Sequence, residues 1–325
     1  MKKLITALCI FAMLISAVAY AAPLRLGVVP WAGFSPADVA FAKGFWKELG
    51  TDVEITSYES NTDMKNALVY KRVDFAIEVT GVWVGLHMED VPVTILAEID
   101  WSFGGDQFIM KKDKSPQTLK GQAVGVFSDA AIPLVYKYFG ENSLRLSDVR
   151  FVEMDAEELP GNFISGRFAA VVCFDQYALR AVKDGNGTVA ATSATYPGCI
   201  RDSFGARSDV LKNVSHADLV NLFRGWIKAV DWLGNPANWE EYKQILNQRT
   251  FKAAYSDSEL RAMVEGVRVH DADMLQKQNQ DKGGMDVYLE EFKIMLREKK
   301  ELKKDFSVQD IFDNSAVMEA LGKGK

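Results

Sequence analysis

Short apolar runs alternate with segments of helical periodicity from residue 24 to residue 191 of the chain. Apolar runs bounded by glycine or polar positions are typical of buried strands, and apolar residues three or four apart are typical of helices. The predicted strands are 24–29, 52–58, 74–79, 93–99, 107–110, 123–127, 150–154, 169–174 and 189–191, and the predicted helices are 35–49, 62–70, 81 onward, 130–139, 156–165, 175–184 and most of the chain after 215. Strands that alternate with helices form mostly parallel sheets joined by crossover helices. The pattern therefore predicts the α/β class.

Residues 100–106, with the sequence Asp-Trp-Ser-Phe-Gly-Gly-Asp, divide this pattern into two α/β units. The glycine pair lies between two predicted strands and supplies a flexible crossing point. The carboxylates and aromatic rings beside the glycines are side chains that suit contacts with a ligand. We interpret the segment as a hinge that is also one wall of a binding site. The alternative is a hairpin loop with acidic residues at the surface.

The two units resemble each other at the end of one strand. Residues 72–80 align with residues 167–175, because each segment has an arginine, a buried strand and a polar residue where the next helix begins. In open α/β sheets, ligands bind beyond the carboxyl ends of the strands. Glu78 to Thr80 and Cys173 to Asp175 are therefore predicted to face each other across one cleft. The alternative is a chance similarity between two buried strands.

The first 21 residues predict an export signal. Two lysines precede an apolar stretch over 4–18, and small residues follow at 19 and 21, which is the order of a cleavable secretory signal. We expect cleavage after Ala21. The alternative is an uncleaved membrane anchor, but the apolar stretch is shorter than the ~20 residues that a span needs. Cys9 lacks the small preceding residue of a lipid attachment site, so we expect an exported, soluble protein.

The charge, the cysteines and the histidines argue against a nucleic-acid partner and against a metal site. The chain has 38 basic and 44 acidic residues and a net charge of −6, and loss of the signal removes two lysines more. An acidic balance argues against nucleic acid as a partner. Cys173 and Cys199 could pair in an oxidising compartment, but we favour two buried free thiols. No metal site is predicted, because the chain has no C-x-x-C motif and its three histidines are far apart.

Six short motifs occur in an order that resembles a known family. They are Pro30-Trp31, Ala42-Lys43-Gly44-Phe45-Trp46, the segment 100–106, Leu119-Lys120-Gly121 before a strand ending in Gly125-Val126, Phe174-Asp175-Gln176-Tyr177, and Pro197-Gly198-Cys199-Ile200-Arg201-Asp202. The chain thus resembles the solute-binding proteins of ABC transporters in the nitrate, taurine and aliphatic-sulfonate group, which also includes binders of pyrimidine precursors of thiamine. The resemblance extends over nearly the whole mature chain.

The resemblance implies a two-lobed periplasmic-binding-protein fold of type II with two hinge crossings, near 100–106 and 195–202. The first lobe would comprise residues 22–106 and 196–325, including the C-terminal helices, and the second lobe residues 107–195. The implied protein is periplasmic and monomeric, binds a small molecule, delivers it to an ABC permease in the inner membrane, and has no cofactor and no catalytic residues.

We expect the ligand-binding residues in loops that follow strands and at the hinges. The candidates are Trp31, Phe34, Ser60, Asn61, Thr62, Glu78, Thr80, Asp100, Trp101, Asp106, Ser128, Asp129, Asp175, Tyr177 and Asp202. Helix N-termini in such loops suit an anionic group. The many carboxylates instead favour a protonated amine or amidine, held by ion pairs and aromatic faces. Glu78-Val79-Thr80-Gly81 also stands where family members commonly have a polar, often glycine-rich loop, which argues against a purely anionic ligand.

Taurine, an aminopyrimidine and a simpler organic amine all remain open as the ligand. Two other functions are alternatives. A secreted sensor module would share the binding fold, and its membrane partner would distinguish it from a transporter component. An enzyme related to thiamine-pyrimidine synthesis would turn its ligand over, but the chain has no cysteine-rich catalytic segment and no G-x-S-x-G motif.

Overall fold

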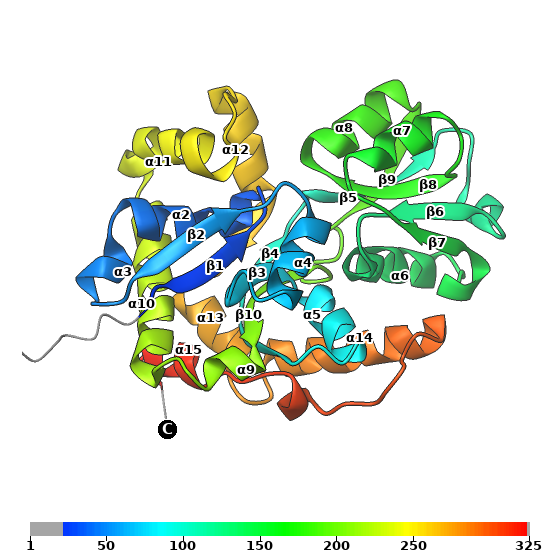
Figure 1. Ribbon diagram of the computed structural model, residues 1–325. Helices are drawn as coiled ribbons and strands as arrows, with labels where there is room; N and C mark the ends of the chain where they lie inside the picture. Colours follow the sequence, from blue (N-terminus) through cyan, green and yellow to red (C-terminus); the bar gives the residue numbers. More distant parts are fainter. Residues whose placement is uncertain (1–21, 324–325) are drawn as a thin grey trace, which may run out of the picture.

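The computed structural model describes residues 22–323, and for Asp175 and Gln176 it describes the backbone alone. The predicted signal peptide, residues 1–21, lies outside the described residues. Figure 1 shows two halves side by side, each built around one sheet that is flanked by helices. The predicted α/β class with two sheets is confirmed.

The sheet of the first half has the strand order β11-β4-β10-β3-β1-β2. Its strands are β1 (Leu24–Val28), β2 (Val53–Ser57), β3 (Phe75–Val79), β4 (Val93–Ser102), β10 (Arg201–Arg207) and β11 (Val267–Val269). β1 pairs in parallel with β2 and β3, whereas β10 is antiparallel to both β3 and β4, and β11 is antiparallel to β4. β1 to β4 therefore all run in one direction, and their carboxyl ends lie at one edge of the sheet.

The sheet of the second half has the strand order β7-β6-β8-β5-β9. Its strands are β5 (Asp106–Lys111), β6 (Ala123–Val126), β7 (Arg150–Glu153), β8 (Ala170–Phe174) and β9 (Gly187–Thr192). β6 is parallel to β7 and β8, and β5 is antiparallel to β8 and β9. Most strands of this sheet also run in one direction.

Helices cover both sheets and connect the strands. In the first half they are α2 (Ser35–Ala42), α3 (Phe45–Glu48), α4 (Asn61–Val69) and α5 (Thr80–Met88), and in the second half α6 (Ile132–Glu141), α7 (Glu158–Ile164) and α8 (Asp175–Asp184). The C-terminal part contains α9 (Ser208–Leu211), α10 (His216–Leu233), α11 (Trp239–Ile245), the π-helix η6 (Leu246–Thr250), α12 (Asp257–Glu265), α13 (Ala272–Asn279), α14 (Gly284–Lys299) and α15 (Ser315–Ala320). The short 3-10 helices are η1 (Ala32–Phe34), η2 (Pro116–Leu119), η3 (Asp129–Ala131), η4 (Leu146–Asp148), η5 (Pro236–Asn238) and η7 (Val308–Asp310).

Two strands of the first sheet were missed by the sequence prediction, and a third is longer than predicted. β10 begins at Arg201, inside the predicted hinge crossing near 195–202, and continues beyond it. β11 lies in the part predicted as mainly helical. β10 is buried in the middle of the sheet, yet it contains Asp202, Ser203 and Arg207, so it does not read as an apolar run. β4 continues to Ser102, so Asp100 lies in a strand instead of a loop.

The predicted helix 35–49 is two helices. Gly44, between α2 and α3, has a φ of 72°. This left-handed backbone conformation costs glycine little and ends a right-handed helix. The glycine signal was present in the sequence and marks the break.

The chain crosses between the halves twice. One crossing is the turn 103–105 between β4 and β5, and the other is the segment 193–200 between β9 and β10. The hydroxyls of Ser102 and Ser193 are 2.7 Å apart, and the Gly104 amide donates to Ser193 Oγ at 2.7 Å. The two crossings are therefore bonded to each other where the halves meet.

α14 starts in the first half and extends along the second half (Figure 1). Near its end, Lys299 Nζ lies 2.9 Å from an oxygen of Asp129 in the second half. The amide of Leu146 donates to Glu298 Oε1 at 3.1 Å. A Cβ atom at Gly81 in α5 would lie 2.8 Å from Ala130 Cα, so the halves are in close backbone contact here. The two halves are thus joined on the α14 side as well as at the crossings.

Cys173 and Cys199 are both buried and unpaired, as predicted. Within residues 22–323, no helix has the length and apolar character needed to span a membrane.

Two glycines within helices offer a matched test of this packing. A Cβ at Gly225 of α10 would lie 2.1 Å from Trp46 Cδ1, whereas a Cβ at Gly140 of α6 meets nothing within 4 Å. We expect Gly225→Ala to lower the free energy of unfolding by roughly 1–3 kcal/mol because the buried indole must move. We expect Gly140→Ala to raise it by up to about 1 kcal/mol, since alanine is the better helix former.

Urea unfolding of both variants measures the two effects. A stabilised Gly225→Ala protein would contradict the close packing of α10 on Trp46.

Candidate functional site

An irregularity in β4 separates two acidic residues that are only two positions apart. Asp202 pairs with Asp100 and Ser203 pairs with Glu98, so Ile99 has no partner in β10. A bulge of this kind changes which side chains share a face of the sheet. Trp101 Nε1 donates to Glu98 Oε1 at 2.5 Å, so Glu98 and Trp101 lie on the same side. Asp100 pairs with Asp202 instead.

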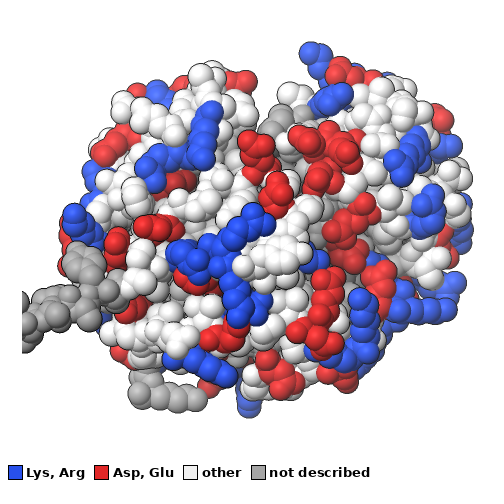
Figure 2. Space-filling model, in the orientation of Figure 1, with Lys and Arg blue, Asp and Glu red and all other residues white. Residues whose placement is uncertain are grey.

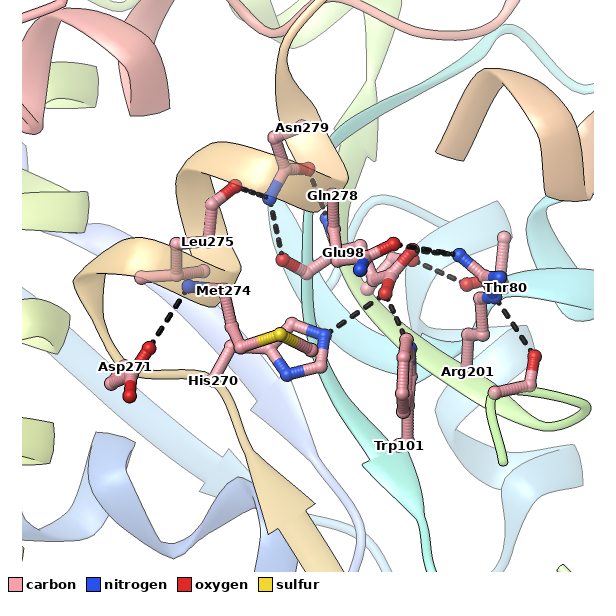
Figure 3. A network of polar contacts seen from close by, with 12 residues as sticks. Thr80, Glu98, Trp101, Arg201, His270, Asp271, Met274, Leu275, Gln278 and Asn279 are labelled. Carbon is pink, nitrogen blue, oxygen red and sulfur yellow. Dashed lines mark hydrogen bonds and ion pairs between the residues drawn. The ribbon is translucent and has the colours of Figure 1, made fainter. Parts of the chain in front are cut away.

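The Glu98 carboxylate is fully buried and has its charge balanced (Figure 3). Arg201 Nη1 donates to Glu98 Oε2 at 2.8 Å, and His270 Nε2 lies 2.9 Å from Oε1. Burial by itself would raise the pKa of Glu98, but the Arg201 charge and the His270 hydrogen bond lower it below its ordinary value. Asn279 of α13 also exchanges two hydrogen bonds with the Glu98 backbone, at 2.7 and 2.8 Å. This network holds the bulge in place.

Asp100 and Asp202 have no such balance. They are 0% and 2% exposed, and their two carboxyl groups face each other. No basic side chain hydrogen-bonds to either carboxyl among the described residues. Burial raises the pKa of Asp100 to about 7. Burial and the nearby charge of Asp100 raise the pKa of Asp202 well above its ordinary value.

Two further acids are buried nearby, one in each sheet. Asp106, the first residue of β5, is 4% exposed, and burial raises its pKa to about 7. Its Oδ1 has no hydrogen-bond partner among the described residues. Burial also raises the pKa of Glu78, at the end of β3, to about 8, although Asn61 Nδ2 donates to its Oε1 at 2.9 Å.

A cavity of about 40 Å³ lies between the two halves, and we call it the inner cavity. It is lined by Val29, Pro30, Trp31, Phe34, Asn61, Val79, Asp106, Phe127, Phe174, Ile200 and Asp202. The Trp31 and Phe174 rings, one from each half, meet edge to face with centroids 5.9 Å apart. Trp31 Nε1 has no hydrogen-bond partner among the described residues. The lining thus combines aromatic faces with two buried carboxyls and includes no lysine, arginine or histidine.

A larger cavity of about 330 Å³ adjoins the inner one, and we call it the outer cavity. The two share Val29, Pro30, Asn61 and Phe174. Its other lining residues are Glu59, Ser60, Asp63, Asp155, Ala156, Glu157, Tyr177, Phe251 and Tyr255. Figure 2 shows acidic side chains gathered along the groove between the two halves.

Several predicted site residues line these cavities. Trp31, Phe34, Asn61, Asp106 and Asp202 line the inner one, and Ser60, Asn61 and Tyr177 the outer one. Glu78 and Asp100 do not line a cavity. Glu78 accepts a hydrogen bond from Asn61, and Asp100 pairs with Asp202 across the two strands. Thr62 bridges the halves, since its hydroxyl donates to Asp155 Oδ1 at 2.8 Å.

The other predicted residues have local partners. Trp101 lies on the Glu98 side of the sheet, and Thr80 Oγ1 is 2.5 Å from Ser203 Oγ. Ser128 Oγ accepts from the Ala130 amide at the start of η3, and Asp129 forms the ion pair with Lys299. Asp175 begins α8, and its side chain lies outside the described residues, so the predicted pairing of Glu78 with Asp175 stays a prediction.

The sequence analysis missed six residues that line the inner cavity: Val29, Pro30, Val79, Phe127, Phe174 and Ile200. It also missed most of the lining of the outer cavity, including Glu59 and Glu157. Pro30, Phe174 and Ile200 each lie within a motif quoted above, so their neighbours pointed to the correct segments. The network around Glu98 had no such signal, because Arg201, His270 and Asn279 are far from Glu98 in sequence. Among residues 22–323, no cluster of three or more His, Cys, Asp or Glu is placed to hold a metal ion.

A model of the NMT1-like family matches residues 19–247. The chain belongs to the NMT1-like family. No curated protein matches this NMT1-like chain significantly.

Solved structures confirm the predicted periplasmic-binding-protein fold for this NMT1-like protein. The periplasmic nitrate-binding protein NrtA from Synechocystis PCC 6803 is 16% identical with a TM-score of 0.69, over 92% of this chain and 88% of that one. The alkanesulfonate-binding protein SsuA from Xanthomonas axonopodis pv. citri, bound to MOPS, is 12% identical with a TM-score of 0.68, over 91% and 100%. The ligand-binding component of an ABC-type import system from Staphylococcus aureus, with zinc bound, is 13% identical with a TM-score of 0.69, over 92% and 99%. At these identities the likeness shows the fold alone.

The buried acids predict an unusual dependence of stability on pH. A carboxyl whose pKa is higher in the folded than in the unfolded protein favours folding while it is protonated. The contribution of Asp106 is therefore fully present only below its ordinary pKa of 3.8 and is lost progressively as the pH rises to about 7. We expect Asp106→Asn to be more stable than the wild type by roughly 1–3 kcal/mol at pH 8, with a smaller difference at pH 5.

Thermal unfolding between pH 5 and 8 measures this difference. Asp113→Asn, in the exposed turn after β5, removes the same charge from the surface and is the control. An Asp106→Asn effect that is equal at pH 5 and pH 8 would show that Asp106 does not carry a raised pKa.

Proposed function

We propose that this protein is the solute-binding component of an ABC importer and that its ligand is a small organic cation. The observation that carries this proposal is the inner cavity: it presents buried carboxyls of Asp106 and Asp202 and four aromatic side chains, with no cationic side chain in its lining. Two ionised carboxylates in one desolvated site are stable only with positive charge between them. A protonated amine or amidinium supplies that charge and also binds to the aromatic faces.

The two halves act as the two lobes of the binding protein in this proposal. The predicted lobes, residues 22–106 with 196–325 and residues 107–195, rotate about the crossings 103–105 and 193–200, and β5 places Asp106 itself in the second lobe. The ligand contacts both lobes only when they are closed, so it favours the closed state. The joined α14 side is where the lobes stay in contact, and the cavities lie where they separate.

The nitrate- and sulfonate-binding proteins that share the fold support a transport role, but their ligands are anions. Nitrate or a simple sulfonate would meet Asp106 and Asp202 without a cationic side chain in this lining. We therefore infer a protein of the same transport class with a different ligand. It acts in the periplasm as a monomer, delivers its ligand to a membrane permease and carries out no catalysis. A sensor with the same fold would bind the ligand equally, and loss of uptake on deletion of the gene distinguishes the transporter.

Binding of amines and anions to one variant tests the ligand class. Asp106→Asn keeps the size of the side chain and removes its charge. Loss of a charge-assisted hydrogen bond in a desolvated site costs about 1.5–3 kcal/mol, so we expect an organic amine to bind the variant roughly ten- to a hundredfold more weakly than the wild type. Calorimetry with an alkylamine, an aminopyrimidine, taurine, an alkylsulfonate and nitrate measures this, with Asp113→Asn as the control. Tight binding of nitrate or alkylsulfonate to the wild type would refute a cationic ligand, and turnover of a bound compound would refute a purely binding role.

Closure predicts a change of shape on binding. At a ligand concentration one hundred times the dissociation constant, the free energy of unfolding should rise by about 2.7 kcal/mol because only the folded protein binds. Small-angle X-ray scattering of the same sample should show a smaller radius of gyration. A ligand that raises the melting temperature without changing the scattering would argue against hinge closure.

A further inference from the structure

The outer cavity, like the inner one, is lined by carboxyl groups and aromatic rings. Its carboxylates come from both halves: Glu59 precedes α4 and Asp63 lies in the first turn of α4, whereas Asp155 and Glu157 come from the segment between β7 and α7. No lysine, arginine or histidine is among its lining residues. Closure therefore brings like charges towards each other across the groove, which disfavours the closed state unless a cation lies between them.

The small volume of the inner cavity limits it to one end of an organic ligand. A water molecule needs roughly 10–15 Å³ of such space, so the inner cavity, at about 40 Å³, holds only about three groups of that size. An ammonium with one or two carbon atoms fills it. The buried Asp106 Oδ1, which has no hydrogen-bond partner among the described residues, and the buried carboxyl of Asp202 would bind this end of the ligand. The rest of an organic ligand has to pass Asn61 and Phe174, which line both cavities, and lie in the outer one.

The outer cavity also offers aromatic surface for this part of the ligand. The Phe251 and Tyr255 rings, after the π-helix η6, meet edge to face with centroids 5.5 Å apart. The Tyr177 and Phe174 rings, from the second half, do the same at 5.5 Å. Aromatic faces with carboxylates beside them attract a second cationic group more than a neutral or anionic one.

We propose that the ligand is an elongated organic dication, with one cationic end in the inner cavity and the other in the outer cavity. This inference rests on the proposed function and adds the length and the second charge. The inner carboxyls bind the first cationic group, and Glu59 and Glu157 select for the second. A monocation of the same length satisfies the inner cavity alone and leaves the outer carboxylates facing each other.

Matched pairs of probes test the second charge. The probes are 1,5-diaminopentane with 1-aminopentane, and 1,4-bis(aminomethyl)benzene with benzylamine. Glu59→Gln/Glu157→Gln removes one outer charge from each half, and both residues are exposed, so the variant should fold. Asp52→Asn/Asp113→Asn is the control, because it removes two charges at the strand ends that point away from the groove.

Calorimetry should show that the wild type binds each diamine about tenfold or more tightly than its monoamine, since several partly exposed ion pairs add up to about 1.4 kcal/mol. The outer variant should lose this preference and keep its affinity for the monoamine, and the control should keep both. Equal binding of diamine and monoamine to the wild type, or an unchanged preference in the outer variant, would overturn the dication and leave the cationic ligand of the proposed function intact. If no amine binds the wild type and an anion does, the proposed function itself fails.

Discussion

Five carboxyl groups are buried where the two halves meet: Glu78, Glu98, Asp100, Asp106 and Asp202. Among the described residues, only Glu98 has a cationic partner. Burying a carboxylate without a partner is costly, so such a group is protonated unless a cation binds beside it. The raised pKa values of the four unpaired acids follow from this, and so does the expectation that a cation stabilises the closed protein.

The bulge at Ile99 produces this division of roles. It places Glu98 with Arg201 and His270, where the charge is balanced and serves the structure, and it leaves Asp100 paired with Asp202. Regular alternation along β4 would put both acids on the same face. The bulge is in turn held by Asn279, whose side chain bonds the amide and the carbonyl of Glu98. A helix from the C-terminal part thus fixes the position of the bulge.

The sequence predicted the position of the first crossing better than it predicted which residues line the candidate site. The acids and glycines of 100–106 marked the first crossing correctly, because Gly104, with a φ of 115°, is a conformational signal that glycine carries in any context. The strand status of Asp100 and Asp202 was missed, because polar residues in a central strand hide its apolar pattern. The separation of Glu98 from Asp100 was beyond reach, since it depends on a pairing irregularity and on partners more than a hundred residues away. Trp101, Ser128 and Asp129 looked equivalent to the cavity residues in sequence, and only tertiary contacts give them local partners.

The uptake or release of protons on binding tests the central claim most directly. If a cation binds to carboxyls that are partly protonated near pH 7, they must ionise, and binding releases protons to the buffer. Calorimetry of one ligand in buffers of different ionisation enthalpy, at pH 6.5, measures the number of protons exchanged. The account predicts net release that decreases in Asp106→Asn. No exchange, or net uptake as an anion would cause, would contradict it.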